Sequence, residues 1–128
     1  KIFTNKPKNI KYIGPVYDLQ KKIKLYASHE LFLLPSKREG MPQVVLESMA
    51  TGTIPIVSNC KGNLDLVKDG YNGYVFDINR PEIAIQKIKR FLNLNEKEKK
   101  EIQKAAINFA KKFKWDNLIK KLESILKE

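Results

Sequence analysis

Apolar residues in the first 80 positions alternate between short continuous runs and helical spacing. Four runs predict β-strands: Ile10–Ile13, Leu31–Leu34, the run that begins at Ile54, and Gly73–Asp77. Between them, spacings of three and four residues predict helices over residues 19–28 and 42–51 and a short helix from Asn63. This alternation predicts an α/β fold in which a Rossmann-like parallel sheet of about four strands has helices on both faces.

The last third of the chain has the pattern of a helical tail. It predicts three consecutive helices, from about Arg80 to Leu92, from a cap at Asn95 to Phe113, and from near Trp115 onward. Asn95 and Glu98 have the spacing of a capping box. We expect a single domain over residues 1–128, which is long enough for one hydrophobic core.

Charge is distributed unevenly along this basic chain. The formal net charge is +11, yet residues 31–80 carry equal numbers of basic and acidic side chains. The basic ends are typical of solvated, Lys-rich helix faces, or of a surface that contacts an anionic membrane or a nucleic acid. Nucleic acid is disfavoured because the lysines are not interleaved with aromatic residues and the sequence has no recognised binding motif. The single cysteine cannot form an internal disulfide, which fits a reducing compartment.

The predicted helix over residues 42–51 begins without a capping side chain. Pro42 suits the first helical position, and neither Gly40 nor Met41 offers a side-chain oxygen to the free amides of the first turn. Free amides and the helix dipole together favour an anion. The helix also follows a predicted parallel strand, and ligands of α/β folds bind beyond the carboxyl ends of such strands.

Two glutamates flank this helix start. Glu39 precedes it, and Glu47 lies about 60° beyond the edge of the apolar face, where it can reach a crevice. Each carboxylate can accept two hydrogen bonds from a sugar diol, so the region could hold a sugar, a diphosphate and a nucleoside. In the alternative interpretation, Glu47 is an ordinary surface residue and Glu39 pairs with Lys37 or Arg38. The residues alone leave both interpretations open.

The stretch from Leu31 to Asp77 also resembles a known family. Its motif residues are Pro35-Ser36, Glu39-Gly40, Pro42, Glu47, Gly52, Pro55, Asp69-Gly70 and Gly73. In this order and spacing they resemble the C-terminal, nucleotide-sugar-binding domain of retaining glycosyltransferases of family 4, which have the two-domain GT-B fold. The resemblance extends from about Ile10 to the end of the chain.

The resemblance implies roles for individual residues. Glu39 is the candidate catalytic residue, in contact with the transferred sugar, and Glu47 would bind the ribose of the nucleoside. The residues expected to line the donor pocket are Gly40, Met41, Pro42 and Gln43. Backbone amides at Gln43 and Val44 would approach the phosphates. The family generally needs no metal or other cofactor, and the sequence has neither a D-x-D triplet nor a His/Cys cluster.

The resemblance also implies a reaction. The whole enzyme would be a hexosyltransferase of polysaccharide biosynthesis that moves a sugar from a nucleoside diphosphate to a glycan or lipid-linked acceptor, with retention of configuration. It would be cytoplasmic, in peripheral contact with the inner face of the plasma membrane. We expect the chain to be an N-terminally truncated domain, inactive alone, that lacks the acceptor domain and the first βα unit. Lys37 and Arg38 are expected to be exposed loop charges, not diphosphate ligands.

Two other functions fit parts of the sequence. One is a non-catalytic module that binds an anionic membrane or a nucleic acid through its basic helices. The other is a nucleotide-sugar epimerase of the same fold type. His29, the only histidine, is expected at a helix end, and one histidine cannot form a metal site or a triad without partners.

Overall fold

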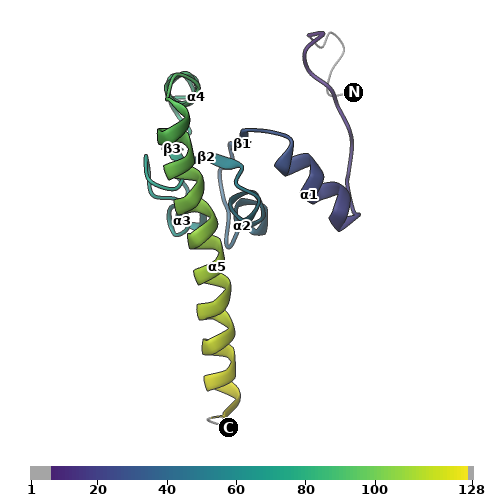
Figure 1. Ribbon diagram of the computed structural model, residues 1–128, viewed down its shortest axis with the longest axis vertical. Helices are drawn as coiled ribbons and strands as arrows, with labels where there is room; N and C mark the ends of the chain where they lie inside the picture. The colour runs from purple at the N-terminus through teal and green to yellow at the C-terminus, as the bar shows by residue number, and fades with distance from the viewer. Residues whose placement is uncertain (1–6, 127–128) are drawn as a thin grey trace.

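The computed structural model describes the backbone of residues 7–126 and the side chains of residues 7–114. Three parallel strands form one sheet in the order β1-β2-β3, with bounds Leu31–Leu34, Ile54–Ser58 and Tyr74–Phe76 (Figure 1). The helices are α1 Leu19–Ala27, α2 Gln43–Ala50, α3 Lys61–Leu64, α4 Glu82–Leu92 and α5 Glu96–Leu126. The predicted α/β fold with a parallel sheet is confirmed.

Strand β2 is the centre of the sheet and of the core. All five of its residues are buried, and it pairs in parallel with both neighbours, with Leu31 opposite Ile54 and Ile56 opposite Tyr74. The apolar run of strand β1 is typical of a strand covered on both faces, but β1 is less buried than β2, and Leu33 is half exposed. The other edge strand, β3, is more buried, with Tyr74 and Phe76 in the core, so the exposure of β1 does not follow from its edge position alone.

The predicted strand Ile10–Ile13 does not form. This segment has no regular secondary structure, and Ile10, Tyr12 and Ile13 are 45%, 63% and 52% exposed. A strand is stable only when its backbone pairs with another strand. Figure 1 shows the purple N-terminal segment running away from the sheet, so the described sheet has three strands instead of about four.

Helix α1 begins where the sequence predicts. The Asp18 carboxylate accepts hydrogen bonds from the amides of Gln20, at 2.8 Å, and Lys21, at 3.2 Å. However, all α1 side chains remain at least partly exposed, and Leu19 and Ile23 on its apolar face are 63% and 45% exposed. The helix is therefore capped and formed, but it buries little apolar surface.

Helix α5 is long, and its first half packs on the core. The capping box is confirmed, since the Glu98 amide donates to Asn95 Oδ1 at 2.8 Å. The predicted stripe lies inward from Ile102 to Phe113, with Ala106 fully buried. The expected break before Trp115 is wrong, because α5 continues to Leu126 and extends past the sheet in Figure 1. The expected roles of the side chains from Trp115 onward lie outside the described residues.

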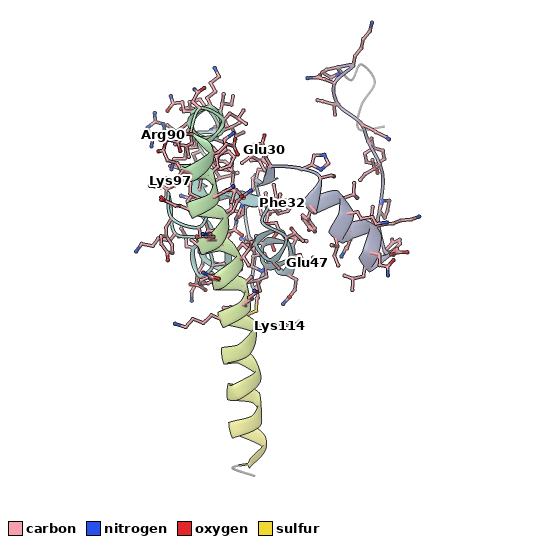
Figure 2. The ribbon with its side chains drawn as sticks, in the orientation of Figure 1. Glu30, Phe32, Glu47, Arg90, Lys97 and Lys114 are labelled. Atoms are coloured by element: carbon pink, nitrogen blue, oxygen red, sulfur yellow. The ribbon has the colours of Figure 1, made fainter. Side chains whose placement is uncertain are left out.

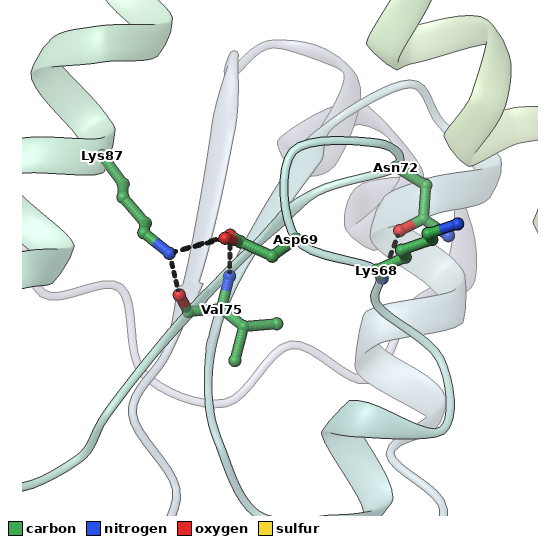
Figure 3. Close-up of polar contacts among 5 residues, drawn as sticks. All are labelled: Lys68, Asp69, Asn72, Val75 and Lys87. Atoms are coloured by element: carbon green, nitrogen blue, oxygen red, sulfur yellow. Dashed lines mark hydrogen bonds and ion pairs between the residues drawn. The ribbon is translucent and has the colours of Figure 1, made fainter.

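The loop between α3 and β3 is held by its own side chains (Figure 3). Asp69 accepts hydrogen bonds from the Val75 amide and from Lys87 Nζ, both at 2.9 Å. Gly70 has a φ of +79°, which a residue with a side chain rarely adopts. Gly73 is needed for a different reason, because a Cβ there would lie 2.6 Å from the carbonyl oxygen of Pro55. Through Asp69, this loop therefore connects β3 to α4.

Candidate functional site

Helix α2 begins at the carboxyl side of β1 with free amides. The first helical residue is Gln43, one residue later than the sequence predicts. Pro42 is the N-cap, with φ −76° and ψ 98°. Its carbonyl accepts a hydrogen bond from the Val45 amide at 3.1 Å, so the amides of Gln43 and Val44 come before the first bond of the helix. Proline has no side-chain oxygen to cap them. The helix start can therefore receive an anion.

Glu39 has a fixed position in the loop between β1 and α2. Its side chain is half-buried, and its Oε1 accepts a hydrogen bond from Ser36 Oγ at 2.8 Å. Only one carboxylate oxygen is used in this contact. The other oxygen can therefore accept hydrogen bonds from the hydroxyl groups of a ligand.

A buried hydrogen-bond network fixes this loop to the rest of the sheet. Ser58, at the end of β2, donates its hydroxyl to the carbonyl of Ser36. Asn63 in α3 donates from Nδ2 to the Ser58 carbonyl at 3.0 Å and lies 3.3 Å from its hydroxyl oxygen. Ser58 and Asn63 are fully buried, and Asn63 Oδ1 makes no hydrogen bond within the described residues. The loop that carries Glu39 is thus tied to β2 and α3.

Helix α3 approaches the same loop closely because Gly62 has no side chain. A Cβ at Gly62 would overlap the carbonyl oxygen of Glu39 and lie 2.6 Å from that of Gly40. Helix α3 begins at Lys61, two residues before its predicted start at Asn63, and Lys61, Gly62 and Ser58 are not among the residues predicted for the site. A glycine in the first turn of a short helix was the available signal, because it often marks a close backbone approach.

The β1–α2 loop and the start of α3 line a cavity of about 480 Å³ that is open to solvent. Such a volume is within the range of small-molecule sites. The lining residues come from the β1–α2 loop and the start of α3: Lys37, Arg38, Glu39, Gly40, Cys60 and Lys61. Among the expected site residues, the structure thus brings Glu39 and Gly40 to this cavity. Met41 and Gln43, which follow in the chain, are exposed beside it, and Pro42 is buried.

Glu47 lies on the side of α2 toward α1 (Figure 2). Its Oε2 is 3.6 Å from Lys22 Nζ on α1, and its side chain is 29% exposed. Burial raises the pKa of Tyr26, also on α1, and the nearby negative charge of Glu47 raises this pKa further. Glu47 thus faces α1, whereas Glu39 faces α3. Their cooperation around a single ligand stays a prediction.

A second, more apolar cavity of about 380 Å³ lies between the N-terminal segment, α1 and β1. The two neighbours of Glu47 on α1, Lys22 and Tyr26, line it together with Phe32 and Leu31 of β1. His29 also lines it and, as expected, lies just after the helix end, with Nδ1 2.6 Å from the carbonyl oxygen of Leu25. This cavity is therefore next to Glu47 and is suited to an apolar ring.

In the described part of the chain, no group of three or more His, Cys, Asp or Glu side chains is arranged to hold a metal ion. None of the described helices combines the length and the apolar character needed to cross a bilayer, including the long but polar α5.

Comparisons with known proteins agree with this architecture. Residues 3–112 match the family model of "Glycosyl transferases group 1". A solved structure, the C-terminal domain of a glycosyl transferase group 1 family protein from Francisella tularensis, superposes with a TM-score of 0.68 at 19% sequence identity. The match covers 78% of this chain and 51% of that chain. This likeness supports the fold.

Two curated relatives extend the comparison in sequence. The chain is 34% identical to glycogen synthase of Mycoplasma mobile over 136 residues, which cover 99% of this chain and 28% of the relative. It is 46% identical over 50 residues to the Escherichia coli UDP-Gal:alpha-D-GlcNAc-diphosphoundecaprenol alpha-1,3-galactosyltransferase, covering 39% of this chain and 13% of the relative. The chain thus spans less than a third of the length of these relatives. By the family match over residues 3–112, the chain belongs to the glycosyl transferase group 1 family.

Proposed function

We propose that this chain is the donor-binding part of a retaining glycosyltransferase of family 4, with a GT-B arrangement. The single observation that carries the proposal is the position of Glu39, which Ser36 orients at an open cavity beside the uncapped start of α2. The carboxylate can accept hydrogen bonds from sugar hydroxyls, and the neighbouring free amides can donate hydrogen bonds to phosphates. Together they match the two polar parts of a nucleoside-diphosphate sugar. Family membership supports the same reaction class.

Each expected site residue has a role in this proposal. Glu39 is the catalytic residue in contact with the transferred sugar, and the amides of Gln43 and Val44 approach the diphosphate. Gly40, Met41 and Pro42 line the donor pocket. Preorganised amides would stabilise the negative charge that develops on the departing diphosphate. No metal or other cofactor takes part in the proposed step.

The nucleoside would lie on the α1 side of α2. Glu47 would accept hydrogen bonds from the ribose hydroxyls, and the apolar cavity that Tyr26 and Phe32 line would receive the base. Lys22, which is 3.6 Å from Glu47, would remain at the rim of this site. The donor would then extend over the start of α2 from one glutamate toward the other.

The acceptor is proposed by analogy with the relatives. Their names describe a glycogen synthase and an enzyme that acts on a diphosphoundecaprenol-linked sugar. For this protein we propose transfer of a hexose to a glycan or lipid-linked acceptor on the cytoplasmic side of the membrane, in polysaccharide biosynthesis. The acceptor would bind outside this chain, so the chain alone would be inactive.

Nucleotide binding tests the donor site directly. Amide NMR spectra of the protein are recorded with uridine, guanosine and adenosine diphosphates at up to millimolar concentration. We expect one of them to shift signals from Gly40 to Glu47, and Glu47→Ala to weaken this binding by about tenfold or more, since a charge-assisted hydrogen bond is lost. Glu101→Ala on α5, which removes an exposed carboxylate, is the matched control. Spectra unchanged by all three nucleotides would contradict the proposal.

We also propose a peripheral contact with anionic membranes. Lysines are exposed along α5, including Lys97, Lys100, Lys104, Lys111 and Lys112. Such clusters are attracted to anionic lipid headgroups, and salt screens the attraction. Sedimentation with phosphatidylglycerol vesicles at low and high salt is the test, and binding that is absent at both would exclude this contact.

A further inference from the structure

The Glu39 carboxylate is connected through Ser36 to two buried residues of other segments. Ser36 donates its hydroxyl to Glu39 Oε1 at 2.8 Å, and its carbonyl oxygen accepts the hydroxyl of Ser58 at the end of β2. Asn63 of α3 donates from Nδ2 to the carbonyl and hydroxyl oxygens of Ser58, at 3.0 and 3.3 Å. A chain of hydrogen bonds therefore runs from α3 through β2 to the candidate catalytic carboxylate.

Asn63 fixes the direction of this chain. An amide nitrogen can only donate, so Asn63 Nδ2 occupies a lone pair of the Ser58 hydroxyl oxygen. The Ser58 proton then points to a carbonyl oxygen, and that of Ser36 is nearer than that of Leu34, which lies 3.4 Å away. Without Asn63, the Ser58 hydroxyl would lose the contact that sets its rotation.

The burial of Asn63 indicates a role beyond stability. Asn63 and Ser58 have no exposed surface, and Asn63 Oδ1 has no hydrogen-bond partner within the described residues. A buried polar atom without a partner destabilises a fold, so an apolar residue of similar volume would serve packing at least as well. Such a residue would lack the donor that holds Ser58.

The orientation of the Glu39 side chain depends on this chain. Its backbone is held from the α3 side, because Gly62 packs directly against the Glu39 carbonyl oxygen. Within the described residues, Ser36 is the one hydrogen-bond partner of the carboxylate, and no ion pair among them involves Glu39. A shift of Ser36 would therefore move the carboxylate, whereas the loop backbone would keep its contact with α3.

We propose that Ser58 and Asn63 are positioning residues of the sugar site, which act through Ser36 to hold the Glu39 carboxylate in one orientation. This inference rests on the proposed function, in which Glu39 contacts the transferred sugar. Both residues are buried and would not touch the ligand. A carboxylate that is already oriented loses less conformational freedom when it binds a hydroxyl group. Recognition of the sugar should thus depend on Ser58 and Asn63, whereas binding of the nucleotide part should not.

The χ1 torsion of Glu39 is the direct readout, because it reports orientation and not stability. Three-bond NMR couplings from Cγ to the backbone nitrogen and carbonyl carbon give its rotamer populations. We expect one dominant rotamer in the wild type and averaged couplings in Ser36→Ala, Ser58→Ala and Asn63→Leu. Circular dichroism checks folding, and Ser36→Ala keeps the test decisive if a buried variant unfolds, since Ser36 is only partly buried. Ser36→Thr retains the hydroxyl and should restore the dominant rotamer.

Ser48→Ala is the matched control. Ser48 is also fully buried, and its hydroxyl also donates to a backbone carbonyl, that of Val45 at 3.0 Å, but it lies outside the chain to Glu39. We expect wild-type couplings in this variant. Equal averaging in Ser48→Ala and Ser58→Ala would overturn the inference, because it would indicate a general loosening. Wild-type couplings in Ser36→Ala, Ser58→Ala and Asn63→Leu would also overturn it.

Pairs of ligands that differ only in the sugar measure the effect on binding. The pairs are uridine diphosphate and UDP-glucose, guanosine diphosphate and GDP-mannose, and adenosine diphosphate and ADP-glucose. For a pair that binds, we expect the sugar to strengthen binding to the wild type and Ser58→Ala to reduce this gain by about threefold to tenfold. The nucleotide without sugar should bind both proteins equally. An undiminished gain in Ser58→Ala would overturn the inference.

These measurements separate the inference from the proposed function. If a sugar nucleotide binds and the Glu39 couplings are the same in all variants, the positioning role is wrong and the donor site stands. If Ser58→Ala and Asn63→Leu release the Glu39 side chain but none of the ligands binds the wild type, the network positions Glu39 as inferred and the proposed function fails.

Discussion

Gly62 of α3 lies directly against the backbone of Glu39. A Cβ on Gly62 would overlap the Glu39 carbonyl oxygen and lie 2.6 Å from the Gly40 carbonyl oxygen, and both are backbone atoms that cannot rotate away. This contact holds the start of α3 against the loop of the candidate catalytic residue. The packing on this side of the cavity therefore requires a residue without a Cβ at position 62.

We therefore expect Gly62→Ala to destabilise the protein by about 1–3 kcal/mol, the usual cost of overpacking a closed site. The neighbouring Gly40→Ala is the matched control, because a Cβ at Gly40 has no atom within 4 Å. Its effect should stay within about 0.5 kcal/mol. Urea unfolding followed by circular dichroism measures both variants. Similar unfolding midpoints for the two variants would show that α3 does not pack on the loop in this way.

The buried network at Ser58 and Asn63 gives a second prediction. Asn63→Ala removes the donor to the Ser58 carbonyl, and Ser58→Ala removes the donor to the Ser36 carbonyl. Each variant leaves a backbone acceptor without its partner in the interior, so each should lose about 1–3 kcal/mol of unfolding free energy. The double variant should lose less than the sum, because the two side chains act in one network.

Ser28→Ala is the control for this network. Its hydroxyl also donates to a backbone carbonyl, that of Leu25, at 2.9 Å, but it is exposed to water. We expect a loss below about 0.5 kcal/mol. Strictly additive losses at Ser58 and Asn63 in denaturant titrations would mean that the two residues are not coupled.

Asp69 and Lys87 join the loop before β3 to α4, and their removal is the third prediction. Asp69→Ala loses both the ion pair with Lys87 and the bond from the Val75 amide, so we expect a cost of about 1–2 kcal/mol. Asp69→Asn keeps an acceptor for the amide and should cost less. Glu82→Gln, in the more exposed pair with Arg80, should have almost no effect. Thermal unfolding compares the three variants, and equal losses for Asp69→Ala and Asp69→Asn would contradict the role of the Val75 bond.

The sequence predicted the elements whose local pattern and tertiary environment agree. Asp18, Asn95 and the apolar stripe of α5 act through contacts within a few residues, and all are as expected. The segment Ile10–Ile13 has a strand pattern, but a strand also needs a partner, and this segment lies away from the sheet. Pattern alone contains no information about that partner.

The candidate site was also predictable only where its residues belong to one continuous segment. Glu39 and the uncapped helix start follow from residue type and position, because both belong to one continuous segment. The contributions of Ser58 and Lys61 come from other segments, which the fold brings to the loop. The separation of Glu47 from Glu39 depends on where α1 packs, which its amphipathic pattern could not show.

The contact between α1 and α2 gives the last prediction, a pH dependence. The pKa of Tyr26 is raised from 10.0, first by burial of the phenol and then by the negative charge of Glu47. The folded protein thus binds this proton more tightly than the unfolded chain does. The resulting stability is present below the ordinary tyrosine pKa of about 10 and is lost as the pH rises through the raised pKa.

As the pH is raised from about 9 to 11, we expect the free energy of unfolding of Tyr26→Phe to fall less than that of the wild type. Urea unfolding at each pH measures both proteins. Lys22, which pairs with Glu47, is present in both proteins, so the comparison isolates the contribution of Tyr26. Glu47→Gln should lower the pKa of Tyr26 toward its ordinary value, which the ultraviolet absorbance of tyrosinate reports. Glu101→Gln removes a carboxylate from α5 and should leave this titration unchanged. Identical alkaline stability profiles for wild type and Tyr26→Phe would show that α1 does not pack beside Glu47 in solution.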